Sequence, residues 1–298
     1  MTEYKNFIDL DKIEYSELRK IVESAKSIKA DLKNGKMDKP LAGKHLAMIF
    51  EKPSTRTRVS FEVGINQLGG HPIVLTSSDS QIGRGEPIID TANVLSRYID
   101  IIMIRTFKHE TLTELAEHAS VPVINGLTDY SHPCQVMTDI LTFEEHLGTI
   151  EGKTIAWIGD TNNMANSWIQ AADKFNFKLH ISTPEEYAPP KNDSKNVIFF
   201  DDPKEAVKNA DCVTSDTWVS MGDEDAEYKI GVLTPYQVNA ELMSFAKDEA
   251  IFMHCLPAHR DEEVTSSVID GKQSVIYDEA ENRLHAQKAI MLWCLNKI

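Results

Sequence analysis

The sequence predicts an α/β protein built from two doubly wound parallel-sheet domains that are joined by helices. Its 298 residues are enough for two domains of ordinary size, each with its own core. Short apolar runs alternate with helix-like segments, which is typical of a parallel sheet covered by helices on both faces. The alternation stops at a long helical segment ending near Gly148 and then starts again. We therefore expect one domain over residues 1–148 and another over residues 149–298.

The first domain begins with a helical pattern over residues 14–32, where apolar residues recur every three or four positions. Buried strands are expected at residues 45–50, 72–76, 100–106 and 121–125. Helices are expected between and after them, at residues 54–68, 88–98, 111–119 and 132–148. Ligands of open α/β sheets bind beyond the carboxyl ends of the strands, so functional residues should follow the strands directly.

The second domain repeats the same order of strands and helices. Its strands are expected at residues 154–160, 178–183, 197–202, 211–217, 251–257 and 274–279. A last helix, over about residues 280–295, has no strand after it and is compatible with packing on either domain.

The composition disfavours several classes of partner. A formal net charge of −15 argues against nucleic acid and anionic membranes, because both select basic surfaces. No run reaches the length of a membrane span, and the N-terminus lacks a signal-like apolar core. The four cysteines form no CxxC pair, so neither a disulfide framework nor a zinc site is indicated. We expect a cytoplasmic protein with no cofactor and no metal.

The segment EKPSTRTRVSFE gathers hydroxyl and guanidinium groups at the start of a helix. Its hydroxyl donors are Ser54, Thr55 and Thr57. A helix start with free N–H groups binds anions, and the planar fork of Arg56 suits phosphate oxygens. Arg58 has an alternative role, because Glu62 lies one turn further on and can form a helical ion pair with it. The plainer interpretation of the whole segment is a capped surface helix.

Three further polar residues follow strands of the first domain. Arg105 ends the third strand, and His132 and Gln135 lie at the start of the long helix. His132 can donate a hydrogen bond to a carbonyl oxygen without carrying a full charge. Each residue also has an ordinary structural interpretation, as a surface arginine or as a helix-capping group.

In the second domain, the segment GDTNN follows the first strand and lacks the GxGxxG spacing of a dinucleotide site. Asn162 and Asn163 offer amide groups at a helix start, and Asn163 could recognise a carboxylate or an amine. Asp216 follows a strand, where a carboxylate can hold an ammonium group. In the segment HCLPAHR, the spacing of His254, Cys255 and His259 matches no structural zinc site.

The segments STRTRVSFE, MIRT, HPCQ, DTWVSMG and HCLP, in this order, closely resemble those of the ornithine carbamoyltransferases. The resemblance covers nearly the whole chain and ends with ENRLHAQKAIM. It implies two α/β domains around a cleft that holds the active site, and a homotrimer with active sites between subunits. The implied reaction joins carbamoyl phosphate to the δ-amine of L-ornithine and gives citrulline and phosphate, in arginine metabolism and with biosynthesis as the expected direction.

The resemblance also implies roles for individual residues. Carbamoyl phosphate would be bound by Ser54, Thr55, Arg56, Thr57, Gln81, Arg105, His132, Pro133, Cys134, Gln135, Cys255, Leu256 and Arg283. Ornithine would be bound by Asn163, Asp216, Ser220 and Met221. Arg105, His132 and Cys255 would be catalytic, and Gln81 would reach the phosphate of a neighbouring subunit. The neutral δ-amine would attack the carbonyl directly, without a protein nucleophile.

Other functions remain open at this point. Aspartate carbamoyltransferase should lack the SMG and HCLP segments, whereas enzymes that use putrescine or acylated ornithine are closer rivals. A binding protein that kept the fold without catalysis has no chemical need for so complete a set of polar residues. A nicotinamide-dependent enzyme is disfavoured by the missing glycine fingerprint.

Overall fold

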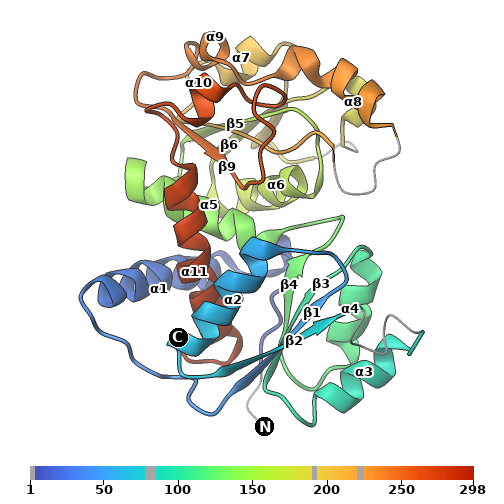
Figure 1. Cartoon of the computed structure of the whole chain (residues 1–298). Helices are drawn as coiled ribbons and strands as arrows, with labels where there is room; N and C mark the ends of the chain where they lie inside the picture. Colours follow the sequence, from blue (N-terminus) through green and yellow to red (C-terminus); the bar gives the residue numbers. More distant parts are fainter. Residues whose placement is uncertain (1–3, 78–84, 190–192, 220–224) are drawn as a thin grey trace. The chain divides into compact units, whose positions relative to one another are not determined.

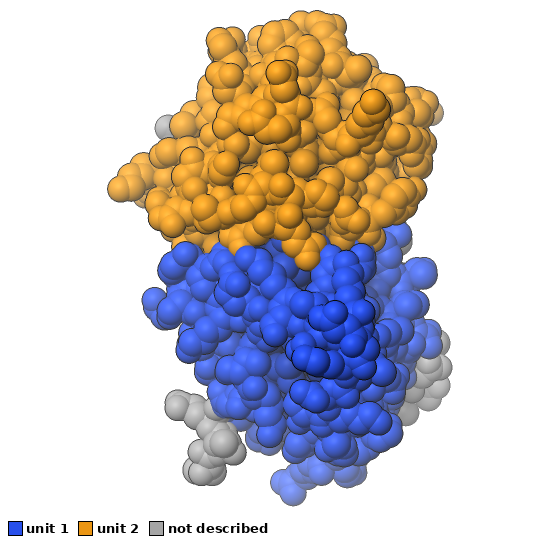
Figure 2. Space-filling view, turned by 90° about the vertical axis from the view of Figure 1, so that its left-hand side faces the viewer, with its two compact units in different colours: residues 1–141, 281–298 blue, residues 142–280 orange. Residues whose placement is uncertain are grey.

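The computed structural model describes residues 4–77, 85–189, 193–219 and 225–298 (Figure 1). The chain forms two compact units, which Figure 2 distinguishes by colour. Unit 1 comprises Met1–Leu141 and Glu281–Ile298, and unit 2 comprises Thr142–Ala280.

Each unit contains one parallel sheet with helices, so the prediction of two parallel-sheet α/β domains is confirmed. The units divide inside two helices, α5 (Pro133–Leu147) and α11 (Ile276–Cys294), whereas the boundary expected from the sequence follows α5. In the described part of the chain, no helix is both long and apolar enough to cross a membrane.

The sheet of unit 1 has the strand order β2-β1-β3-β4. Its strands are β1 (His45–Phe50), β2 (His71–Thr76), β3 (Ile101–Arg105) and β4 (Val123–Leu127), and all pairs are parallel. Besides α5 and α11, unit 1 contains η1 (Leu10–Lys12), α1 (Tyr15–Lys33), α2 (Thr55–Gln67), α3 (Ile88–Leu95) and α4 (His109–His118). β1 and β3 are nearly continuous apolar runs because helices cover both faces of these central strands.

Figure 1 shows α3 and α4 on one side of this sheet, with α2 and α11 on the other. One apolar cluster joins alternate residues of β1 and β3 to α3 and α4. Its members include Ala47, Ile49, Ile102, Ile104, Ile88, Ala92, Leu112 and Leu115. This burial aligns the carboxyl ends of β1 and β3, where Phe50 is paired with Arg105.

The sheet of unit 2 has the strand order β7-β6-β5-β8-β9 and is also parallel throughout. Its strands are β5 (Thr154–Ile158), β6 (Lys178–Ser182), β7 (Val197–Phe199), β8 (Cys212–Ser215) and β9 (Ile251–His254). Its other elements are α6 (Asn163–Phe175), η3 (Glu185–Tyr187), α7 (Pro203–Val207), α8 (Ala226–Leu233), η4 (Thr234–Tyr236), α9 (Ala240–Met243) and α10 (Ser266–Ile269).

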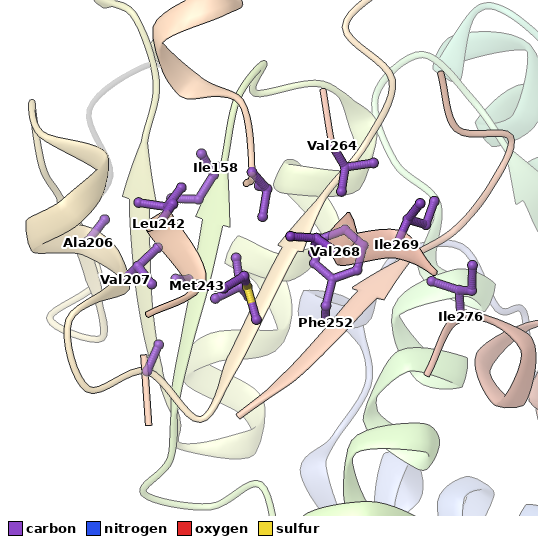
Figure 3. Close-up of a cluster of buried hydrophobic side chains, with 14 residues drawn as sticks. Ile158, Ala206, Val207, Leu242, Met243, Phe252, Val264, Val268, Ile269 and Ile276 are labelled. Carbon is purple, nitrogen blue, oxygen red and sulfur yellow. The ribbon is translucent and has the colours of Figure 1, made fainter. Parts of the chain in front are cut away.

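The core on one face of this sheet is formed by strand residues and by the short helices α7, α9 and α10. Figure 3 shows Ile158 and Phe252 from β5 and β9 among the side chains of this cluster. Val207, Met243 and Val268 contribute one side chain from each of the three helices. The short helices therefore bury apolar surface against β5, β8 and β9 and support the loops that follow these strands.

One strand expected from the sequence is wrong. Residues 274–279 do not form a strand, because only Ser274 bridges to Phe252 and α11 already begins at Ile276. Val275 N–H donates to the carbonyl of Phe252 at 3.0 Å, which completes the short pairing. Asp278 and Glu279 then lie in the first turn of α11, where acidic side chains favour the positive end of the helix.

Candidate active site

Each sheet has one point where the strand order switches direction, and polar residues gather there. In unit 1 the switch lies between β1 and β3, and in unit 2 it lies between β5 and β8. Open α/β sheets bind ligands at the carboxyl ends of the strands beside such a point. α2 follows β1, Arg105 ends β3, and Asp216 directly follows β8.

The start of α2 is suited to an anion. The side chain of Ser54 caps the helix by accepting a hydrogen bond of 3.2 Å from Thr57 N–H. The first turn contains no acidic residue, so its N–H groups and the helix dipole keep a positive potential. Arg58 is paired with Glu62, with 3.0 Å between Nε and Oε1. The side chain of Arg56 has no such ion pair with the residues that the structure describes, so it is available to a ligand.

Thr57 is the centre of a buried cationic cluster. Its Oγ1 accepts hydrogen bonds from Arg283 Nη2 at 2.8 Å and from Arg105 Nη1 at 3.4 Å. Arg283 Nη1 also donates to Oε1 of Gln135. Thr57, Gln135 and Arg283 are 1%, 0% and 3% exposed. Charges shielded from water act more strongly on a ligand, so this cluster favours a phosphate and the oxygen of a polarised carbonyl.

His132 and Cys134 lie at the start of α5, and the structure keeps both uncharged. Burial lowers the pKa of His132 well below its usual range, and the positive charges of Arg283 and Arg105 lower it further. His132 is therefore a neutral imidazole at physiological pH and can donate one hydrogen bond. Burial raises the pKa of Cys134 to about 12, and its thiol donates to the carbonyl of Asn125 at 3.2 Å. Cys134 is thus a protonated thiol rather than a nucleophile.

In unit 2, Asp216 is half-buried and is surrounded by hydrogen-bond donors. Its Oδ2 accepts from Asn162 Nδ2 at 2.7 Å, and its Oδ1 accepts from Thr217 N–H at 2.8 Å. The thiol of Cys255 donates to the same Oδ1 at 3.2 Å. No lysine or arginine forms an ion pair with Asp216 among the residues that the structure describes. A half-buried carboxylate without a cation suits an ammonium ligand.

Asn162, which the sequence placed at a helix start but did not mark as an ornithine ligand, is the asparagine that contacts Asp216. It is the N-cap of α6, and its Oδ1 accepts from Met164 N–H at 2.9 Å. Asn163, the expected ligand, is the first residue of α6, and its carbonyl accepts from Ser167 Oγ. The strong preference for asparagine at N-caps is the signal that could have identified Asn162.

The backbone after β9 has an unusual conformation. Leu256 has a φ of +58°, which is uncommon for a residue with a branched side chain and is often found at functional sites. Leu256 N–H donates to Nδ1 of His254 at 3.0 Å, and His254 N–H donates to Oε2 of Glu279 at 2.8 Å. These bonds fix the peptide groups on both sides of Cys255. The turn thereby determines where the carbonyl and the thiol of Cys255 point.

Two groups of side chains in unit 2 bring metal-ligating atoms within 4.8 Å of one another. They are Asp216 with His254 and Cys255, and His259 with Glu262 and Glu263. In the first group, Nδ1 of His254 already accepts from the backbone, and its Nε2 lies 3.3 Å from Oε1 of the buried Glu263. The absence of a metal stays a prediction.

Three expected site residues, Gln81, Ser220 and Met221, lie outside the described residues. The structure brings the expected unit 1 residues Thr57, Arg105, Gln135 and Arg283 into direct contact, and it does the same for Asp216 and Cys255 in unit 2.

Comparisons with known proteins agree with this fold and these groups. Residues 5–145 match the carbamoyl-P binding domain of aspartate/ornithine carbamoyltransferase, and residues 151–294 match its Asp/Orn binding domain. The chain therefore belongs to the aspartate/ornithine carbamoyltransferase family and is an enzyme that transfers the carbamoyl group.

Relatives and solved structures narrow this class to its ornithine branch. The chain is 59% identical to the ornithine carbamoyltransferase of Rhodopseudomonas palustris strain BisA53, over 99% of this chain and 98% of the relative. It is 60% identical to that of Nitrobacter winogradskyi, over 98% and 97%. The structure of the Pyrococcus furiosus enzyme is similar with a TM-score of 0.94 at 46% identity, over 99% and 98%. That of the Burkholderia thailandensis enzyme has a TM-score of 0.91 at 49% identity, over 97% and 98%. The resemblance to ornithine carbamoyltransferases is confirmed.

Proposed function

We propose that this enzyme transfers the carbamoyl group of carbamoyl phosphate to the δ-amine of L-ornithine, giving L-citrulline and phosphate. The observation that carries the proposal is Asp216, a half-buried carboxylate that has hydrogen-bond donors but no cationic partner among the described residues. Such a group suits the α-ammonium of a free amino acid. Acylated ornithine lacks that ammonium group, whereas putrescine keeps a second ammonium but lacks the α-carboxylate.

Carbamoyl phosphate binds to the residues of unit 1, which we call the phosphate half-site: Ser54, Thr55, Arg56, Thr57, Arg105, His132, Pro133, Cys134, Gln135 and Arg283. The phosphate lies at the start of α2, where N–H groups, hydroxyls and Arg56 neutralise its charge. Arg105, His132 and Thr57 donate to the carbonyl oxygen. The neutral state of His132 supports this role, because a neutral imidazole polarises the carbonyl without repelling the neighbouring arginines.

We call the site residues of unit 2 the acceptor half-site: Asn162, Asn163, Asp216, Ser220, Met221, Cys255 and Leu256. Ornithine binds to these residues except Cys255 and Leu256, which contact the carbamoyl phosphate. Asp216 pairs with the α-ammonium and thereby selects which end of ornithine reacts. The Leu256 carbonyl, in the turn after β9, and Gln135 accept from the amide nitrogen of the carbamoyl group. Cys255 lies beside the reacting amine.

The reaction needs no protein nucleophile. The neutral δ-amine attacks the carbonyl carbon, a C–N bond forms, and negative charge develops on the carbonyl oxygen. Arg105, His132 and Thr57 stabilise that charge as preorganised donors. The C–O bond to phosphate then breaks, and the leaving phosphate takes a proton from the amine.

We further propose a cytoplasmic homotrimer that acts in arginine biosynthesis. Exposed apolar side chains on the edge strand β2 and on α2 and α3, which lie on opposite sides of the sheet (Figure 1), support association through unit 1. They include Val59, Val63, Ile73, Ile89 and Val94. Gln81 of one subunit would then reach the phosphate bound by its neighbour.

The test is citrulline-type product formation from carbamoyl phosphate, with ornithine, putrescine, N-acetylornithine and aspartate offered in parallel. We expect turnover with ornithine and at least about tenfold less with N-acetylornithine, which lacks the ammonium that pairs with Asp216, and with putrescine, which lacks the α-carboxylate. Loss of one charge-assisted contact costs about 1.5–3 kcal/mol. Aspartate has no δ-amine and should not be used. Equal use of N-acetylornithine would show that Asp216 does not select the free amino acid.

A further inference from the structure

Lys288, on α11, is a buried lysine that the proposed reaction does not use. It is 2% exposed, and its Nζ donates to Oε1 of Gln67, at the end of α2, at 2.8 Å. The Gln67 amide is neutral, and no carboxylate of the described residues forms an ion pair with Lys288. Burying an ammonium without a counter-charge favours its neutral form, and burial lowers the pKa of Lys288 to about 8.

Lys288 also lines a cavity of about 210 Å³ within unit 1. The inner wall includes Ile28, Leu32 and Leu68, whereas Met37 and Asp38 belong to an exposed segment that lines the same cavity. The remaining charged side chains around it are Asp31 of α1 and Lys36, which lie 3.8 Å apart and are both well exposed. Ile298, the last residue, also lines the cavity and places its terminal carboxylate in this part of unit 1. On this measure of volume a single water molecule needs about 10–15 Å³, so a small uncharged reagent has room to enter the cavity beside Lys288.

The side chain of Lys288 fills a close contact between α11 and α2. A Cβ atom at Gly64 of α2 would lie only 3.3 Å from Cγ of Lys288. One and a half turns earlier on α11, Arg283 donates to Thr57 in the first turn of α2. α11 therefore holds α2 at both ends, through Thr57 near the anion site and through Gln67 at the far end.

We propose that Lys288 is a carbamoylation site, modified by isocyanic acid from the decomposition of carbamoyl phosphate, and that the modification lowers activity by displacing α2. The supply of this reagent rests on the proposed function, because it assumes that the enzyme works in the presence of carbamoyl phosphate. In the decomposition, the C–O bond to phosphate breaks and a nitrogen-bound proton passes to the phosphate. The products are isocyanic acid and hydrogen phosphate.

The amine nitrogen of Lys288 then adds to the carbon of isocyanic acid. A C–N bond forms, one bond of the C=N pair opens, and the amine proton ends on the isocyanate nitrogen. The product is a neutral urea, so the uncompensated buried charge disappears. The added carbon, oxygen and nitrogen have to fit beside Gly64 and Gln67, where the two helices are already in contact.

The expected selectivity follows from the fraction of neutral amine. At about pH 7.4 an ordinary lysine is neutral in about one molecule per thousand, against about one in five for a pKa of about 8. Because a less basic amine is also a weaker nucleophile, we expect an advantage of at least about tenfold rather than the full ratio. Lys29 is the matched internal control, because it is 7% exposed but lies 3.9 Å from the carboxylate of Glu281 and does not line the cavity.

The experiment exposes the full-length protein to potassium cyanate at about pH 7.4. Peptide mass spectrometry follows the occupancy of each lysine, and activity is measured on the same samples. A second arm replaces cyanate with carbamoyl phosphate in the absence of ornithine. We expect Lys288 to react at least about tenfold faster than Lys29 and the exposed lysines, with loss of activity in proportion to its occupancy. Lys288→Arg retains a donor toward Gln67 but has no reactive amine, so it should keep its own starting activity for longer.

Reaction of Lys288 at the rate of the exposed lysines would overturn the proposal. Equal loss of activity in the Lys288→Arg variant would overturn the link to α2 and indicate damage at another residue. The experiment with cyanate shows which lysine reacts without any enzymatic turnover. Its result therefore does not depend on whether the proposed function is correct. Modification by cyanate but not by carbamoyl phosphate would refute the assigned source of the reagent.

Discussion

The phosphate half-site and the acceptor half-site differ in how firmly their polar groups are held. In the first, Thr57, Gln135 and Arg283 are almost completely buried and are connected by hydrogen bonds. In the second, Asp216 and Cys255 are only half-buried, and Asp216 is held mainly by one side-chain amide and one backbone N–H. Groups that meet developing charge gain most from being fixed in advance, because no reorganisation is needed during the reaction.

This difference in burial and fixation matches the different roles of the two half-sites in the proposed reaction. The phosphate half-site has to stabilise charge that appears only in the transition state. The acceptor half-site has to recognise a flexible substrate and direct one of its two amines. We therefore expect substitutions in unit 1 to lower kcat strongly, and substitutions in unit 2 to act first on the KM for ornithine.

The largest effect should come from Arg105→Ala. Arg105 ends β3, contacts Thr57, and is expected to donate to the carbonyl oxygen in the transition state. Loss of one such donor typically lowers kcat by about 10²–10³-fold. The measurement is kcat with both substrates saturating, with thermal unfolding as the control for folding. A kcat within threefold of wild type, on the order of a neutral substitution, would remove Arg105 from the catalytic groups.

The sequence could predict those site residues that are recognised by their immediate neighbours in the chain. The start of α2 was predictable because a hydroxyl cap, a proline and two arginines follow an apolar strand within a few residues. The pairing of Arg58 with Glu62 was foreseen as an alternative because both residues lie on one face of the same helix. Asp216 was predictable because it directly follows β8, and ligands of open α/β sheets bind at the carboxyl ends of the strands.

Contacts between distant segments could not be predicted from local pattern. Arg283 lies 226 residues from Thr57 and in the middle of a helix, so only the family resemblance indicated it. The strand expected at residues 274–279 was wrong because its short apolar run occurs both in strands and at the starts of buried helices. The choice between Asn162 and Asn163 depends on where α6 begins, and helix ends are uncertain by one or two residues.

The second prediction concerns pH and tests whether deprotonation of the δ-amine limits its attack on the carbonyl carbon. The δ-amine resembles a lysine amine with a pKa of about 10.4, so its neutral fraction rises about tenfold per pH unit near neutrality. With carbamoyl phosphate saturating, kcat/KM for ornithine should increase by up to about 100-fold between about pH 6.5 and 8.5. His132 contributes no step in this range, because burial already keeps it neutral. A flat profile would contradict direct attack by the neutral amine.

The third prediction compares two arginines of the same helix. Arg56→Ala should weaken carbamoyl phosphate binding by about 1.5–3 kcal/mol, the typical value of a charge-assisted hydrogen bond. Arg58→Ala is the matched control, because its guanidinium is exposed and paired with Glu62. Isothermal titration with carbamoyl phosphate measures both variants. The interpretation fails if the two variants bind equally well, or if Arg58→Ala is the weaker.

The fourth prediction separates the two half-sites directly. Asp216→Asn keeps the shape of the side chain but removes the charge that we propose pairs with the α-ammonium of ornithine. We expect kcat/KM for ornithine to fall at least about tenfold while carbamoyl phosphate affinity stays within about twofold. The two quantities are measured by steady-state kinetics and by titration with carbamoyl phosphate alone. If both decline together, Asp216 supports the fold rather than the acceptor.

The smallest effect, and the finest test of the acceptor half-site, concerns Asn162. This residue has two tasks, since its Oδ1 caps α6 and its Nδ2 donates to Asp216. Asn162→Ala should lower the free energy of unfolding by about 1 kcal/mol through loss of the cap, and it should also raise the KM for ornithine. Asn162→Ser can still cap the helix but lacks the amide donor, so it should recover stability without recovering KM. Urea unfolding and ornithine kinetics measure the two tasks separately, with Asn163→Ala as the neighbouring comparison. If Asn163→Ala raises the KM and both Asn162 variants leave it unchanged, the asparagine expected from the sequence is the ligand, and the contact with Asp216 has no role in recognising ornithine.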